Sequence, residues 1–142
     1  MADRKAVWRI LDANINRALE GLRVCEDLVR FHLGSESHYR RLRTLRHALT
    51  FQIRRLPVNP IAMLRVRNSR LDPGRLARAS SVESLEHLLL INLQRVKEAI
   101  RVLEESSRLI APRQALGFQR LRFRTYDVER DLLIRVATLR HR

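Results

Sequence analysis

The chain has 142 residues and a mass of 16.8 kDa, a length that fits one helical domain, residues 1–142, with its own core. Its single cysteine, Cys25, excludes a disulfide framework and a cysteine-based zinc site. No apolar run reaches the ~18 residues that a membrane helix needs, and the first residues lack the apolar stretch of a signal peptide. We therefore expect a cytoplasmic protein without a membrane partner.

The charge is strongly positive and is carried by arginine. There are 29 basic and 15 acidic residues, which gives a net charge of +14, and only Lys5 and Lys97 are lysines. Such a surface attracts phosphate groups on nucleic acids or small metabolites, although a compositional or heat-adaptive arginine bias explains the same excess. Aromatic residues make up only 5% of the chain, too few for a base-stacking platform, so nucleic acid is not the expected partner.

Apolar residues recur at helical spacing, and no segment alternates long enough to indicate a strand. The pattern predicts an all-α protein with helices over residues 4–33, 37–56, 81–110 and 112–141. Gly34 is a stop signal and Ser35 a cap for the second helix.

Three further signals place the remaining helix ends. Pro57 ends the second helix. Ser80 with Glu83 forms a capping box for the third, and Pro112 suits the first turn of the fourth.

The connection over residues 57–79 differs from the rest of the chain. It is rich in proline and arginine, and loops of this length are usually lids or linkers. Apolar residues in its first half favour a lid docked on the helices: Ile61, Met63, Leu64 and Val66.

An internal repeat relates residues 14–33 to residues 92–111. Seven of the first seventeen aligned positions are identical, and six of those seven are polar. The repeat predicts two duplicated helical hairpins that pair as a four-helix bundle, with the connection between them.

The repeated polar residues fall at defined places on the helices. Asn14 and Asn92 lie in the middle of the apolar arc, where an unpaired amide costs about 1–3 kcal/mol. Either the two asparagines bond each other or nearby arginines and fix helix register, or the helices diverge there and leave a cleft for a ligand. The margins of the arc carry Arg17, Arg95, Glu26 and Glu104, and the polar face carries Glu20, Arg23, Glu98 and Arg101.

Residues 9–27, RILDANINRALEGLRVCED, resemble the opening signature of a helical domain that is fused ahead of thiamine-phosphate synthase in some bacteria. The resemblance continues through residues 67–69, 72–74, 92–105 and 122–129. That family is described as an alternative hydroxymethylpyrimidine-phosphate kinase. The chain departs from the family pattern at Asn68, where the family carries an acidic residue, and it includes no synthase barrel.

The resemblance implies a kinase that transfers a phosphoryl group from ATP, with Mg²⁺, to 4-amino-5-hydroxymethyl-2-methylpyrimidine phosphate. Phosphoryl transfer needs mainly positioning, a metal ion and cations. The expected catalytic residues are Arg17, Glu26, Arg95 and Glu104, with Glu26 and Glu104, or alternatively Glu20 and Glu98, on the metal. The expected substrate-binding residues are Asn14, Glu20, Arg23, Arg67, Arg70, Asp72, Asn92, Glu98 and Arg101.

Two alternatives to the kinase stay open. The chain could be a non-catalytic partner that binds pyrimidine phosphates and docks on thiamine-phosphate synthase, or a basic helical nucleic-acid binder supported only by its charge. The sequence does not decide between a monomer and a homodimer formed through the second or fourth helix.

Overall fold

The computed structural model describes residues 3–140, and within that range every regular element is helical. The four long helices are α1 (Arg4–Leu28), α2 (Glu36–Arg54), α4 (Leu85–Ile110) and α5 (Pro112–Arg140). A π-helical turn, Val29–Leu33, extends α1, and the connection contains the short helix α3 (Pro60–Val66) and a 3₁₀ turn, Ser69–Leu71. The prediction of an all-α chain is confirmed.

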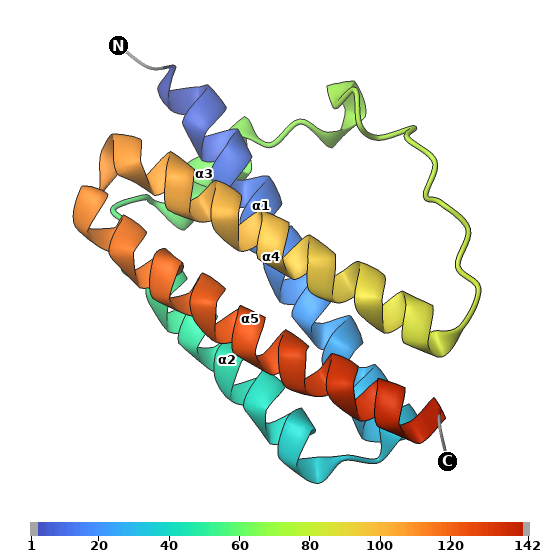
Figure 1. Ribbon diagram of the computed structural model, residues 1–142. Coiled ribbons are helices and arrows are strands. Elements are labelled where there is room, and N and C mark those ends of the chain that lie inside the picture. Colours follow the sequence, from blue (N-terminus) through green and yellow to red (C-terminus); the bar gives the residue numbers. More distant parts are fainter. Residues whose placement is uncertain (1–2, 141–142) are drawn as a thin grey trace.

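The long helices form two antiparallel hairpins that pair side by side (Figure 1). Helix α1 packs against α4 and α2, and α5 packs against α4 and α2, so each long helix packs against two of the other three. The core between them contains Leu11, Leu45, Leu93 and Phe118, all at most 1% exposed. A helical bundle is thus the observed architecture, whereas its origin by duplication remains a prediction.

Short turns close both hairpins. Gly34 adopts a left-handed backbone with φ of 62°, a conformation that side chains disfavour, and it ends the first arm as predicted. Ser35 is the N-cap of α2, but its hydroxyl contacts His38 Nδ1 at 2.6 Å instead of a backbone N–H. Pro112 starts α5 directly after Ala111, as its missing N–H favours.

The third predicted helix begins later than expected. Residues 80–83 are exposed and lie outside any helix, so the Ser80–Glu83 capping box is wrong. Ser84 is the N-cap of α4 and its Oγ accepts the His87 N–H at 3.0 Å. The cap is therefore a serine, as expected, but it lies four residues later than the predicted one.

The connection is more structured in its first half than in its second. Asn59 caps α3 by accepting the backbone N–H groups of residues 61 and 62 at 2.9 and 3.2 Å. Helix α3 packs on α1, where Met63 is buried while Ile61 and Leu64 stay about half exposed. Only part of the expected docking face is therefore used.

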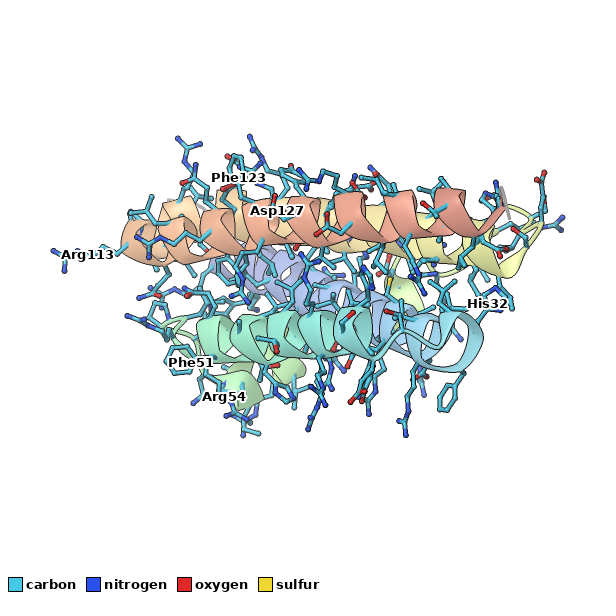
Figure 2. The ribbon with its side chains drawn as sticks, turned by 60° about the horizontal axis from the view of Figure 1, so that its bottom comes forward. His32, Phe51, Arg54, Arg113, Phe123 and Asp127 are labelled. Atoms are coloured by element: carbon cyan, nitrogen blue, oxygen red, sulfur yellow. The ribbon has the colours of Figure 1, made fainter. Side chains whose placement is uncertain are left out.

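Side chains on the outer faces of the bundle project away from the core (Figure 2). Among them are large apolar groups on α2 and α5, with Phe51 64% and Phe123 54% exposed. No helix of residues 3–140 is long and apolar enough to cross a membrane.

Candidate functional site

A groove of about 560 Å³ runs along the line where α1 meets α4. Its size lies in the range of small-molecule sites. The repeat supplies both sides in matched pairs, so six of the predicted site residues meet here. The lining residues are Asn14, Arg17, Glu20, Gly21 and Val24 from α1, and Asn92, Arg95, Glu98, Ala99 and Val102 from α4.

Small residues allow the helices to touch beneath this groove. A Cβ placed on Gly21 would lie 3.4 Å from the Asn92 carbonyl oxygen and only 2.8 Å from Val96 Cγ2, and the second distance is closer than side chains normally approach. Ala99, the repeat counterpart of Gly21, is also small and buried. The two helices therefore stay in close contact instead of diverging, and the groove lies on the outside of this contact.

The two central asparagines satisfy part of their hydrogen bonding within their own helices. Asn14 Nδ2 donates to the Ile10 carbonyl at 2.8 Å, and Asn92 Nδ2 donates to the Leu88 carbonyl at 2.9 Å. Arg17 Nη1 also donates to Asn14 Oδ1 at 3.4 Å. Both asparagines are 5% exposed, and they do not bond each other. Both side-chain amides line the groove, where their remaining hydrogen-bonding positions can meet a ligand.

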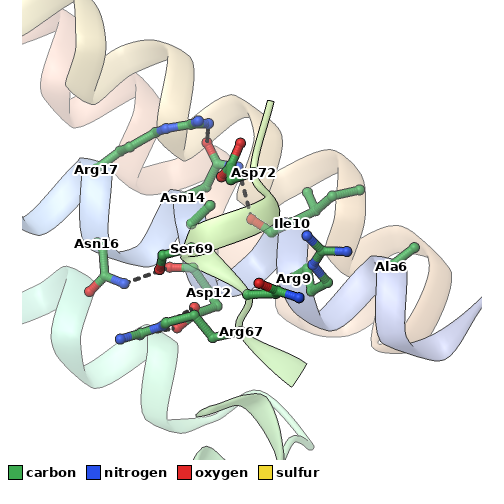
Figure 3. A pocket seen from close by; sticks show the side chains of 12 residues that line it. Ala6, Arg9, Ile10, Asp12, Asn14, Asn16, Arg17, Arg67, Ser69 and Asp72 are labelled. Atoms are coloured by element: carbon green, nitrogen blue, oxygen red, sulfur yellow. Dashed lines mark hydrogen bonds and ion pairs between the residues drawn. The ribbon is translucent and has the colours of Figure 1, made fainter. Parts of the chain in front are cut away.

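A second pocket, of about 530 Å³, lies between α1 and the connection (Figure 3). Asn14 and Arg17 line both this pocket and the groove, so the two cavities adjoin at these residues, and together they are called the depression. Its other residues combine apolar and charged side chains. They are Ala6, Arg9, Ile10, Asp12, Ala13 and Asn16 of α1, with Arg67, Asn68, Ser69 and Asp72 of the connection.

Arg67 joins the connection to α1 through a two-point ion pair. Its Nε lies 2.7 Å from Asp12 Oδ2 and its Nη2 lies 2.6 Å from Asp12 Oδ1. Hydrogen bonding to Asp12 raises the pKa of Arg67 above its ordinary value. The guanidinium of Arg67 therefore stays protonated throughout the physiological pH range.

Hydrogen bonds within the connection hold the next residues. Asn68 Oδ1 accepts the Leu71 N–H at 3.2 Å, and Asp72 Oδ1 accepts the Gly74 N–H at 2.7 Å. These two turns fix the wall of the pocket that faces α1. Asn68 thus has a local structural role as a cap.

Glu26 and Glu104 lie away from the groove. Both are buried, at 1% and 6% exposed. Glu26 binds Arg46 of α2 at 2.6 and 3.1 Å, and Glu104 binds Arg122 of α5 at 3.1 Å through each of its oxygens. Each carboxylate is thus occupied by an arginine of the other helix in its own hairpin.

These ion pairs perturb the guanidinium groups. Hydrogen bonding to Glu26 raises the pKa of Arg46. Hydrogen bonds to Glu104 and then to Tyr126 raise the pKa of Arg122. This geometry favours a structural role for the two glutamates, joining helices within each hairpin.

The remaining predicted residues lie outside the depression. Arg23 is exposed and 3.9 Å from Glu26. Arg101 lies 3.5 Å from Glu104 and 3.4 Å from Glu105. Arg70, in the 3₁₀ turn, lines neither the groove nor the pocket beside the connection.

Glu20 and Glu98 are the acidic groups of the groove. Both are exposed, and Glu98 Oε1 accepts a hydrogen bond from Gln94 at 2.9 Å. Residues 3–140 contain no cluster of three or more acidic, histidine or cysteine side chains that could hold a metal ion by themselves. Mg²⁺ is commonly bound through one or two carboxylates with substrate phosphates and water, so this pair fits a magnesium–nucleotide complex better than a free ion.

The fold and this depression define an all-helical domain in which two paired hairpins share a charged groove along their joint. The chain belongs to the ThiD2 family, which it matches over residues 9–131. No solved structure matches it significantly.

Curated relatives with the name thiamine-phosphate synthase match almost the whole chain. A protein of Nostoc sp. is 34% identical over 92% of this chain and 36% of its own length. One from Synechocystis sp. is 38% identical over 93% of this chain and 38% of its own length. One from Rhodopirellula baltica is 34% identical over 99% of this chain and 38% of its own length. The chain thus spans little more than a third of the curated relatives it matches.

Proposed function

We propose that this protein acts in thiamine biosynthesis as a kinase that converts 4-amino-5-hydroxymethyl-2-methylpyrimidine phosphate and ATP into the pyrimidine diphosphate and ADP. The observation that carries the proposal is the groove whose arginines and carboxylates come in matched pairs from α1 and α4, next to the pocket beside the connection. Family membership and the names of the longer relatives support the same pathway.

The two parts of the depression suit the two substrates. The pocket beside the connection offers apolar groups at Ala6, Ile10 and Ala13 for a small flat ring. The groove offers Arg17 and Arg95 for a polyphosphate, because guanidinium groups bind phosphate oxygens at two points. Asn14 and Arg17 lie at the junction of the two parts, where the phosphoryl group passes between substrates.

Glu20 and Glu98 would hold Mg²⁺ in this arrangement. The ion supplies charge neutralisation on the phosphates when it is bound. An oxygen of the substrate's phosphate attacks the γ-phosphorus of ATP, the bond from that phosphorus to the β–γ bridging oxygen breaks, and ADP leaves with the bond electrons. Arg17 and Arg95 orient the two reactants and balance the charge on the transferred group.

The test is release of ADP by purified protein. We expect release that requires both Mg²⁺ and the pyrimidine phosphate. Glu20→Gln and Glu98→Gln should each reduce kcat about 100-fold, in the range seen when one charge-stabilising group is removed. The matched control is Asp27→Asn, an exposed acid of α1 outside the groove, which should keep wild-type activity. Tight pyrimidine binding without ADP release would contradict the kinase proposal.

A second candidate is a non-catalytic partner of thiamine-phosphate synthase. It is favoured by the curated relatives, in which the matching segment is little more than a third of a longer protein with that name. This candidate predicts co-purification with a separate synthase and no ATP consumption. Release of ADP by the isolated chain would exclude it.

A further inference from the structure

The ion pair between Arg67 and Asp12 leaves one arm of the guanidinium unused. Nε and Nη2 of Arg67 take both oxygens of Asp12. Nη1 makes no hydrogen bond to any residue between 3 and 140. The Arg67 side chain is 42% exposed and lines the pocket, while the Asp12 side chain is only 13% exposed. The carboxylate is thus the fixed partner, and the guanidinium presents its free nitrogen beside the pocket.

Apart from this ion pair, Arg67 is held through its backbone, whose N–H donates to the Leu64 carbonyl at 3.2 Å at the end of α3. Met63, one turn earlier, is the buried residue of α3, whereas every residue from 67 to 83 is exposed. Asp12, by contrast, follows the fully buried Leu11 on α1 and lies two positions before Asn14. The rigid helix therefore holds the arginine of the exposed connection at the pocket.

The charges around this pocket suit a phosphate monoester. Arg9, Arg17 and Arg67 oppose Asp12 and Asp72 among its lining residues, so it keeps a net positive charge. Because the two-point pair with Asp12 fixes the plane of the guanidinium, its remaining nitrogen is preorganised for an anion. A lysine or an unpaired arginine would have to lose more conformational freedom on binding.

We propose that Asp12 is a positioning residue that aims Nη1 of Arg67 at the phosphate of the pyrimidine substrate in the pocket beside the connection. This assignment rests on the proposed function, and it makes Asp12 act on substrate affinity only through Arg67. The nucleotide in the groove does not depend on the pair.

The test is a double-mutant cycle on steady-state kinetics. Asp12→Asn and Arg67→Gln should each raise KM for the pyrimidine phosphate about 10-fold, the equivalent of one charge-assisted hydrogen bond, and leave KM for ATP within about twofold. The double variant should be no weaker than Arg67→Gln alone, because each change removes the same interaction. The matched controls are Asp27→Asn on α1 and Arg78→Gln in the connection, both exposed, and neither should change either KM.

Hydrogen exchange of the free protein supplies a readout that needs no substrate. Asp12→Asn should speed exchange of the amides of residues 67–72 and leave those of α2 unchanged. The positioning role would be overturned if the KM of the double variant for the pyrimidine phosphate rose by the product of the two single effects. It would also be overturned if Asp12→Asn sped up exchange and left that KM unchanged. If Asp12→Asn changes the exchange as expected but the wild-type protein releases no ADP, only the kinase proposal is refuted. Equilibrium binding of the pyrimidine phosphate would then be measured on the wild type, the two single variants and the double variant. The dissociation constant of the double variant should again be no weaker than that of Arg67→Gln alone.

Discussion

Removing the negative charge of Glu104 distinguishes a structural from a metal-binding role for this residue. In Glu104→Gln, Arg122 keeps its hydrogen bond to Tyr126 at 3.0 Å but loses the carboxylate that bound its Nε and Nη2. The two side chains are only 8% and 10% exposed, so a cation is left nearly buried without its counter-charge. We expect a loss of about 3 kcal/mol in the free energy of unfolding, at the lower end for a broken buried pair.

The first hairpin provides an internal comparison. Glu26 is even more deeply buried than Glu104, but the Arg46 side chain is 21% exposed, so water replaces part of the interaction that this arginine loses. Glu26→Gln should therefore cost less, about 2 kcal/mol. At about 3 °C per kcal/mol for a chain of this length, the two variants should unfold about 9 °C and about 6 °C below the wild type in a calorimetric scan.

The double variant Glu104→Leu with Arg122→Met should recover most of the lost stability, because apolar residues of similar size often replace a buried ion pair at little cost. The structural assignment is refuted if Glu104→Gln unfolds at the wild-type temperature and yet abolishes Mg²⁺-dependent ADP release. That combination would return Glu104 to the reaction centre.

Three further variants or probes test other parts of the fold. Gly21→Ala should lower the free energy of unfolding in urea by about 1 kcal/mol, because overpacking against Val96 exceeds the gain in helix propensity. Adding Val96→Ala should reverse this loss, and an unchanged unfolding midpoint in the single variant would contradict the close approach of the helices. Burial raises the pKa of Cys25 to about 12, so the native thiol should not react with a disulfide reagent at pH 8 and should react fully in denaturant. Burial, and secondly the charges of nearby arginines, lower the pKa of His38 below 6.5. As the pH falls, His38 is therefore protonated in the unfolded chain before it is protonated in the folded protein, so stability should fall as the pH drops below 6.5. The variant His38→Gln should lack this part of the pH dependence.

The helices were predictable because their signals are local. Gly34 and Pro112 mark helix ends through backbone geometry that no neighbour can override. The π-helical turn Val29–Leu33 lies inside the predicted first helix and carries no such signal. The start of α4 was misplaced because residues 80–84 contain three serines, each a possible cap by residue type, and Ser84 is the one that caps the helix.

The site was predictable where the repeat placed equivalent residues on one helix face. Asn14, Arg17 and Glu20 meet their counterparts in the groove for that reason. For a residue at the margin of the apolar arc, periodicity does not show which neighbouring helix it contacts. Glu26 forms its ion pair with Arg46 of α2 and does not line the groove with α4.

Other residues of the site left weaker signals. Asp12 escaped prediction because its repeat counterpart is Leu90, so no pairing drew attention to it. Gly21 could have been found, since its counterpart Ala99 is also small and such a pair indicates close helix contact.

The second half of the connection, which is exposed, links the two hairpins covalently but adds little to the packing between them. Residues 72–83 contribute no buried side chain, whereas α1 with α4 and α2 with α5 meet through the core. A proteolytic cut in this stretch therefore severs the covalent tie and leaves the packed interface intact. The two fragments would then be subunits of a heterodimer, and the groove would become a shared site whose occupancy rises with the concentration of either half.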